Sequence, residues 1–178
     1  RRAPPAGCPT PNPAATAFRP FEDSAIEQSI PARFEQQVRA HGERLAIRRD
    51  TGSYAYAALN ATANRLARMI IARSDASAAP VALLFDHGGD ALAAIIAVLK
   101  AGKFYVVLDP GYPPDRLQYM LEDSGARLLI ADGAQREYAR RLCGGTIERV
   151  DFDDVDPALP GDNLPFHEFR HDGNLLFT

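Results

Sequence analysis

Two histidines near the carboxyl end have a spacing that metal sites use. His167 and His171 lie four residues apart, as two ligands on one face of a helix would. Three carboxylates are close to them in the sequence: Asp162, Glu168 and Asp172. Pro165 and Gly173 argue against a helix, and no third strong ligand stands beside the pair. We therefore favour a solvated loop, and we predict no metal site in this chain.

A second group of polar residues follows the apolar run at 81–85. The stretch from Asp86 to Gly89, which includes His87, comes where α/β proteins often place functional residues. It lacks the G-x-G-x-x-G spacing of a dinucleotide-binding turn, which argues against a plain nucleotide-binding domain. We favour a structural role for it, or a place at the rim of a site, over a catalytic role.

Charge and composition exclude several classes of protein. Lys and Arg (20) are outnumbered by Asp and Glu (23), which argues against nucleic acid as a partner. We expect the densest acidic cluster on a solvated face: Asp151, Asp153, Asp154 and Asp156. Cys8 and Cys143 indicate neither a disulfide framework nor a zinc site. The longest apolar run, 91–99, is shorter than the roughly 20 residues of a bilayer span, and we expect a soluble cytoplasmic protein.

The elements that would position any site begin after a tail. Residues 1–20 are rich in Pro and Ala, which predicts a linker or disordered segment. Ser29 and Gly42 are typical of the start and end of a helix. A hairpin at 45–56 and a helix at 57–73 are expected next. On the second helix, four polar residues share the side that we expect to face solvent: Asn60, Asn64, Arg65 and Arg68.

From residue 80 onward, apolar strands alternate with helices. Continuous apolar runs predict strands buried on both faces at 81–85, 104–108 and 128–131, with a further candidate at 146–152. Helices are expected between them, and the one at 90–100 would bury a row of large residues: Leu92, Ile95, Ile96 and Leu99. This alternation predicts an α/β fold, with a mostly parallel sheet covered by helices.

The most specific segment is the stretch from Leu99 to Leu117, LKAGKFYVVLDPGYPPDRL. It resembles the second core motif of nonribosomal peptide synthetase adenylation domains, L-K-A-G-x-A-Y-V-P-L-D-P-x-Y-P-x-x-R-L. These domains belong to the superfamily of acyl-CoA synthetases and luciferases. Its apolar residues suit a core, so we assign the motif an architectural role. Gly102 would turn the helix into the strand, and Asp109 with Pro110 would end the strand.

Two earlier segments support the resemblance. Residues 56–67, YAALNATANRLA, are similar to the first core motif, T-Y-x-E-L-N-x-x-A-N-R-L-A, and residues 29–38 resemble the entry helix of the family. Ala55 and Ala58 depart from the pattern, because they replace the Thr and Glu that usually cap the helix. Val107 replaces the usual proline. None of these changes is expected to touch a substrate.

The last residues resemble the start of an ATP-binding loop. Residues 174–178 read as a buried strand, and Phe177 with Thr178 match the first two positions of the family's loop, (Y/F)-T-S-G-(S/T)-T-G-x-P-K-G. Such glycine-rich loops bind phosphates through backbone N–H groups. The resemblance thus implies that residues 21–178 are the N-terminal part of an adenylation domain, cut at this loop. Thr178 would be its one nucleotide-binding residue, with no catalytic residue in the chain.

The function implied by the resemblance is that of an adenylating ligase. The parent enzyme would use ATP and Mg²⁺ to convert an amino-acid carboxylate into an acyl-adenylate. The acyl group would then pass to a phosphopantetheine thiol on a carrier protein, and a condensation-type domain could precede the chain. We expect the 178-residue chain alone to be inactive. The alternatives are another AMP-forming acid–thiol ligase, such as an acyl-CoA synthetase, or a non-catalytic interaction fragment with an exposed sheet edge.

Overall fold

The structure of the protein is a computed structural model. Its described residues are 23, 26, 28–49, 52–74, 79–86, 88–145 and 147–165. The predictions for the tail at 1–20, for His87, for His167 and His171, and for the strand ending in Thr178 lie outside them. Among the described helices, none is both long enough and apolar enough to cross a membrane.

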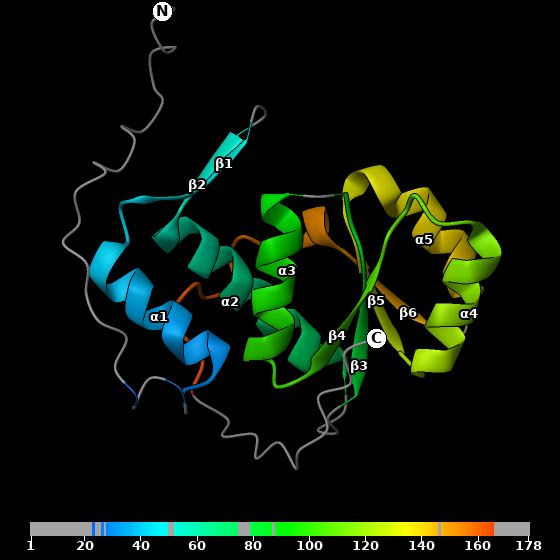
Figure 1. Cartoon of the computed structure of the whole chain (residues 1–178), viewed down its shortest axis with the longest axis horizontal. Coiled ribbons are helices and arrows are strands. Elements are labelled where there is room, and N and C mark those ends of the chain that lie inside the picture. The colour runs from blue at the N-terminus through cyan, green and yellow to red at the C-terminus, as the bar shows by residue number, and fades with distance from the viewer. Residues whose placement is uncertain are drawn as a thin grey trace, which may run out of the picture.

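Helices lie on both sides of a parallel sheet (Figure 1). The helices are α1 (Ile30–His41), α2 (Tyr56–Arg73), α3 (Gly89–Lys100), α4 (Pro114–Ser124) and α5 (Arg136–Cys143), with short 3₁₀ helices η2 (Gly133–Gln135) and η3 (Phe152–Asp154). The strands are β1 (Leu45–Arg49), β2 (Gly52–Ala55), β3 (Pro80–Leu84), β4 (Phe104–Leu108), β5 (Leu128–Ala131) and β6 (Glu148–Asp151). The parallel sheet has the order β4-β3-β5-β6, and β1 and β2 form a separate antiparallel hairpin. The predicted α/β class and parallel sheet are confirmed.

The first two helices begin in different ways. The Ser29 side chain accepts a hydrogen bond from the Ala32 N–H at 3.3 Å, which caps α1 as the sequence predicts. Ala55 at the start of α2 provides no side-chain cap, as expected from its type. The main chain of the preceding turn substitutes for it, because the Gly42 and Arg44 carbonyls accept from the first N–H groups of α2 at 2.9 and 3.0 Å.

The parallel strands alternate their side chains between two cores. On the α2 and α3 side, the core includes Val81, Leu83 and Ile130. On the α4 and α5 side, it includes Leu84 and Leu129. Strands β3 and β5 are both buried, as their continuous apolar sequences predict.

The prediction that β4 is a buried strand is wrong. Phe104 is 40% exposed and Val107 is 52% exposed, because β4 lies at the end of the sheet and pairs only with β3 among the described strands. An apolar run shows that a strand suits a core, but not where the strand lies in the sheet. Gly102 does allow the turn into this strand, with φ of 70°.

The buried side of α3 also differs from the expectation. Leu92 is 45% exposed, and Ile95, Ile96 and Leu99 are only partly buried. The fully buried residues are small or medium in size: Ala93, Ala94, Ala97 and Val98. Helix α2 brings the buried Ala63 and Ala67 to the same core. Small residues on both helices permit close packing, so the large side chains of α3 lie at the edge of the interface.

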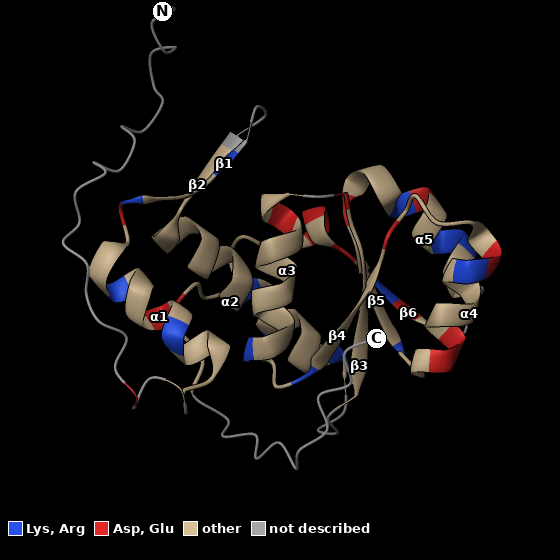
Figure 2. Ribbon diagram, in the orientation of Figure 1, with Lys and Arg blue, Asp and Glu red and all other residues tan. Residues whose placement is uncertain are grey.

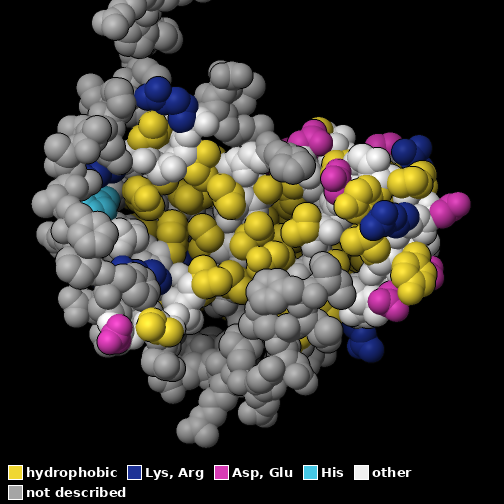
Figure 3. Space-filling model, in the orientation of Figure 1, with side chains coloured by type: hydrophobic (Ala, Val, Ile, Leu, Met, Phe, Trp, Pro, Cys, Tyr) yellow, Lys and Arg dark blue, Asp and Glu magenta, His cyan; other side chains and the backbone are white. Residues whose placement is uncertain are grey.

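Charged and hydrophobic side chains lie on different parts of the surface seen in Figures 2 and 3. Acidic and basic residues run along α4 and α5, whereas α3 is uncharged between its two ends (Figure 2). Hydrophobic side chains gather across the middle of the same view (Figure 3). The exposed hydrophobic residues of α3 and β4 are Leu92, Phe104, Tyr105 and Val107.

Candidate functional site

The turn after β3 is held by an acidic residue that follows the neighbouring strand, β5. Asp132 directly follows β5, and its carboxylate accepts from the backbone N–H of Asp86 at 3.1 Å and from that of Gln135 at 2.9 Å. One carboxylate therefore joins the carboxyl ends of β3 and β5 and caps η2. These carboxylate contacts serve the backbone, and the rim role proposed for the Asp86 stretch stays a prediction.

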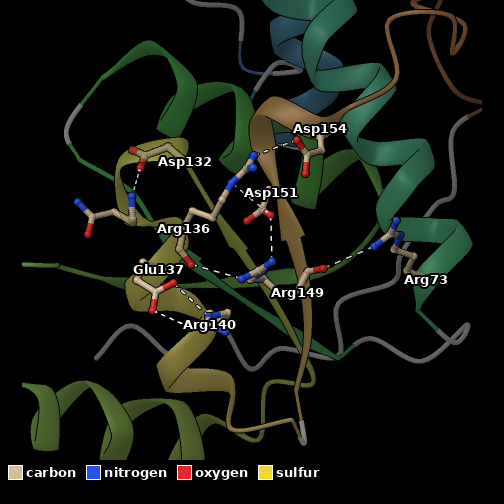
Figure 4. A network of polar contacts seen from close by, with 9 residues as sticks. Arg73, Asp132, Arg136, Glu137, Arg140, Arg149, Asp151 and Asp154 are labelled. Carbon is tan, nitrogen blue, oxygen red and sulfur yellow. Dashed lines mark hydrogen bonds and ion pairs between the residues drawn. The ribbon is translucent and has the colours of Figure 1, made fainter.

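An ion network closes the adjacent end of β6 (Figure 4). Asp151 lies 3.5 Å from the Arg136 guanidinium and 3.2 Å from that of Arg149, and Arg136 also pairs with Asp154 at 2.9 Å. The hydrogen bond that Arg136 donates to Asp154, with the negative charges of Asp154 and Asp151, raises the pKa of Arg136 above its ordinary value. These contacts tie α5 to β6 and η3.

The predicted solvated face is correct for three of its four acidic residues. Asp153, Asp154 and Asp156 are exposed, but Asp151 is only 7% exposed because it ends a strand beneath two arginines. Within the described part of the chain, no group of three His, Cys, Asp or Glu side chains could hold a metal ion.

A second polar group lies on the opposite side of the sheet from α4 and α5, where four buried side chains meet one exposed residue. We call it the Asn163 cluster, and its members are Glu35 from α1, Asn60 and Asn64 from α2, Lys100 from α3, and Asn163 from the segment after η3. The Asn163 Oδ1 atom accepts from Asn60 Nδ2 at 2.8 Å, from Asn64 Nδ2 at 3.1 Å and from Lys100 Nζ at 3.5 Å. The Lys100 ammonium also donates to the Glu35 carboxylate. Two helices, α2 and α3, thus meet one loop residue, and α1 joins the group through the contact of Glu35 with Lys100.

The same segment makes further contacts with α2. The Gly161 carbonyl accepts from Asn64 Nδ2 at 2.8 Å, and the Leu159 carbonyl accepts from Arg65 Nε at 3.0 Å. A Cβ atom on Gly161 would lie 3.0 Å from the Ala61 Cβ, so the backbone approaches the helix closely there. The segment 159–163 is therefore fixed along α2 at successive points.

These contacts correct the expected solvent face of α2. Asn64 is fully buried and Asn60 nearly so, while Arg65 and Arg68 are partly buried. The segment around Gly161 covers this side of the helix and binds its polar groups. Sequence periodicity could not show this, because the covering residues are about 100 positions away.

The ion pair of the cluster lies in a dry environment. Burial lowers the pKa of Lys100, whereas the hydrogen bond and the charge of Glu35 raise it, and the charge of Arg68 lowers it further. The net direction is downward, so the site disfavours the ammonium despite its partner. Glu35 keeps the lysine from being a lone buried charge, which such a site would not tolerate.

Sequence reasoning missed Glu35 and Asn163 as members of a cluster. Lys100, Asn60 and Asn64 lie within the two motif segments at 99–117 and 56–67, but the apolar residues of those segments pointed to packing alone. A polar residue inside an otherwise apolar motif was the available signal. Its partner could not be named from sequence, since Asn163 lies in a Pro- and Asp-rich stretch with no periodicity.

Solved structures resemble this fold. A nonribosomal peptide synthetase, FmoA3 in its α-methyl-L-serine-AMP-bound form, gives a TM-score of 0.70 at 23% identity, over 76% of this chain and 15% of that chain. The O-succinylbenzoate coenzyme A synthetase of Bacillus subtilis gives 0.61 at 22% identity, over 68% of this chain and 31% of that one. At these identities the likeness concerns the fold alone.

Sequence relatives are large peptide synthetases. One of the plipastatin synthase proteins of Bacillus subtilis is 50% identical over 144 residues, which are 80% of this chain and 5% of the relative. Tyrocidine synthase 3 of Brevibacillus parabrevis is 34% identical over 150 residues, 82% of this chain and 2% of the relative. This chain therefore spans only a few per cent of these proteins. The sequence also matches the AMP-binding enzyme family over residues 34–170, most of the chain, and the chain belongs to that family.

Proposed function

We propose that the protein containing this chain activates an amino-acid carboxylate for loading onto a carrier protein. In that reaction a carboxylate oxygen attacks the α-phosphorus of ATP, and pyrophosphate leaves. The carrier thiol then attacks the acyl carbon of the acyl-adenylate, a thioester forms, and AMP leaves. The single observation that carries this proposal is the family match over residues 34–170, with peptide synthetases among the relatives.

The described residues fit a supporting part of such an enzyme. Asp132 and Asp151, at the carboxyl ends of β5 and β6, bind backbone N–H groups and arginines respectively. Among the described residues, no three His, Cys, Asp or Glu side chains are placed to hold a metal ion. We place the nucleotide and Mg²⁺ site at Thr178 and in parts of the protein that this chain does not include. The amino-acid specificity, the Mg²⁺ requirement, the phosphopantetheine-bearing carrier, a condensation-type domain before residues 1–20 and a cytoplasmic location belong to the same proposal.

The test is pyrophosphate exchange into ATP. We expect the synthetase that contains this chain to catalyse exchange that depends on one or a few amino acids in a panel of twenty. We expect the purified 178-residue chain to give the blank rate with every one of them. Exchange by the short chain would show that residues 1–178 already contain the catalytic site, and absence of exchange by the synthetase would contradict the proposed activity.

The fold likeness to a coenzyme A synthetase supports one alternative acceptor. A coenzyme A ligase would transfer the acyl group to free coenzyme A, whereas a peptide synthetase would transfer it to a carrier protein. The comparison is direct: radiolabelled amino acid is supplied with ATP and either coenzyme A or the holo-carrier. We expect label on the carrier, and label on coenzyme A alone would favour the other ligase.

A further inference from the structure

Helix α1 lies against α2 and α3 with little apolar contact. All twelve residues of α1 are described, and Glu35 is the only buried one. Ile30 is 67% exposed. Phe34 is partly buried against the α2 and α3 core, where its ring lies 6.2 Å from that of Tyr56. The most enclosed side chain of α1 is therefore a carboxylate.

The partner of this carboxylate comes from α3. The Lys100 ammonium donates to Glu35, and the two side chains are only 3% and 8% exposed, respectively. Burial is the main reason that the pKa of Lys100 is lowered, and the positive charge of Arg68 on α2 lowers it further. A buried ammonium with a second cation nearby needs an anion at its side. Glu35 supplies that anion.

The sequence offers this contact at one position of the helix. Glu35 is the only acidic residue of α1, and Lys100 is the only basic residue of α3. If α1 moved along its axis by one turn, about 5.4 Å, Pro31 or Arg39 would replace Glu35 opposite Lys100. Proline brings no charge, and arginine would bring a further cation. Either shift leaves a buried charge without its partner, which is costly.

Apolar contacts discriminate less between such positions. Burial of apolar area has no direction, and the side-chain rows of two packed helices can interdigitate again after a shift of one turn. A buried ion pair generally adds little stability compared with well-packed apolar residues, and its best-attested use is to fix a register. The contact between α1 and α3 is therefore suited to selecting one position of α1 rather than to strengthening its attachment.

We infer that Lys100 and Glu35 form a register lock, which holds α1 at one position against α2 and α3. With both residues replaced by apolar ones, the chain should stay as stable as the parent, but α1 should occupy more than one position. The match to the family begins at residue 34, within α1, so the lock lies inside the matched part of the chain. Both are positioning residues, and the lock needs no nucleotide.

The position of α1 can be measured between two spin labels on the 178-residue chain. The labels are attached to Ala40→Cys on α1 and to Tyr119→Cys on α4, both at exposed positions, in a Cys8→Ser background. Cys143 is buried, so it should stay unlabelled. Pulsed electron–electron double resonance then gives the distribution of distances between the labels, and urea denaturation of the same chains gives their stability.

Two double variants separate the ion pair from packing. Glu35→Leu with Lys100→Met removes the pair and keeps apolar bulk, whereas Glu35→Lys with Lys100→Glu keeps a pair in reversed order. Glu137→Leu with Arg140→Met removes an exposed pair of α5 and is the matched control. We expect one distance maximum in the parent, the reversed pair and the control. Glu35→Leu with Lys100→Met should add a second maximum, displaced by up to about 5 Å, while its urea midpoint stays at or above that of the parent.

Three results would overturn the inference. One is a single parental maximum in Glu35→Leu with Lys100→Met, which would show that packing alone sets the position of α1. Another is failure of that variant to fold, or a urea midpoint well below that of the parent, since the pair would then supply stability rather than register. The third is failure of the reversed pair to give a single maximum, or a second maximum in the control, because the number of positions would then not follow the ion pair.

Discussion

The two faces of the parallel sheet are packed by different means. On the α4 and α5 side, the core consists of aliphatic residues, alanines and one cysteine. On the α2 and α3 side, an equally apolar core is joined by the Asn163 cluster with its buried charges. The difference follows from what each face must hold. Regular helices satisfy their own backbone groups, whereas the irregular segment 159–163 needs side chains as partners.

The largest effect on stability is expected from breaking the Lys100–Glu35 ion pair on the α2 and α3 side of the sheet. Lys100→Met leaves the Glu35 carboxylate buried without its cation, and the free energy of unfolding should fall by about 3–5 kcal/mol. Urea denaturation of the 178-residue chain measures the loss. Replacing both partners, as Glu35→Leu with Lys100→Met, should restore stability to the parent level or above it.

The matched control is an exposed pair on the apolar face. Arg140 pairs with Glu137 at 2.9 Å, with both side chains largely in solvent, so Arg140→Met should leave the free energy of unfolding close to that of the parent. If Lys100→Met costs no more than this control, the buried pair does not differ from a surface pair and the contrast between the faces is lost.

Removal of an aliphatic side chain tests the other face. Leu121 on α4 is fully buried, and Leu121→Ala should lower the free energy of unfolding by about 2–5 kcal/mol through lost burial and the cavity that remains. Tyr119→Ala, at an exposed position of the same helix, should change it by no more than about 0.5 kcal/mol. Hydrogen exchange at 159–165 under native conditions should stay as protected as in the parent, and a matching loss there would show that the two faces are not independent.

A smaller effect is expected at the edge strand β4, where a substitution should change the self-association of the chain. Strand β4 has exposed apolar side chains and no described partner beyond β3, so we expect the 178-residue chain to self-associate through it. Val107→Lys should shift the chain toward the 19.4 kDa monomer in sizing chromatography, because edge lysines oppose strand pairing. Tyr119→Lys, on the outside of α4, should leave the profile unchanged. A parent chain that elutes as a clean monomer would argue against an interaction role for β4.

The smallest effect concerns the thiol within the apolar face. Burial raises the pKa of Cys143, with the charge of Arg149 lowering it and that of Asp151 raising it. At about pH 8 the fraction of Cys143 in the thiolate form is therefore lower than for an ordinary exposed cysteine. The side chain is also almost inaccessible to solvent. In a Cys8→Ser background, iodoacetamide should react at least tenfold more slowly with the native chain than with the chain in urea. Equal rates would mean that α5 opens readily.

Most of the fold was predictable because it depends on local signals. Ser29 and the glycines that follow helices mark the ends of elements, and continuous apolar runs mark β3 and β5. The motif at 99–117 also indicated the family, which the match over 34–170 confirms. Such signals operate over a few residues and need no knowledge of distant contacts.

The failures concern contacts between distant residues. Nothing local shows that Val107 lies in an edge strand, that α3 buries its alanines rather than Leu92, or that Asn64 is covered by Gly161. Each depends on which element lies next to it. The proposed nucleotide residue, Thr178, stays a prediction, because it lies outside the described residues.

The start of α2 has a consequence for how this protein tolerates change. Its first N–H groups bind the carbonyls of Gly42 and Arg44, and a carbonyl is present whatever the side chain is. Substitutions at positions 55 and 58 should therefore change the stability of the helix little, which is consistent with the two alanines found there. What the arrangement cannot absorb is a change of length. A single residue inserted or deleted between α1 and β1 would move both carbonyls at once, so the start of α2 depends on the length of this turn more than on its residue types.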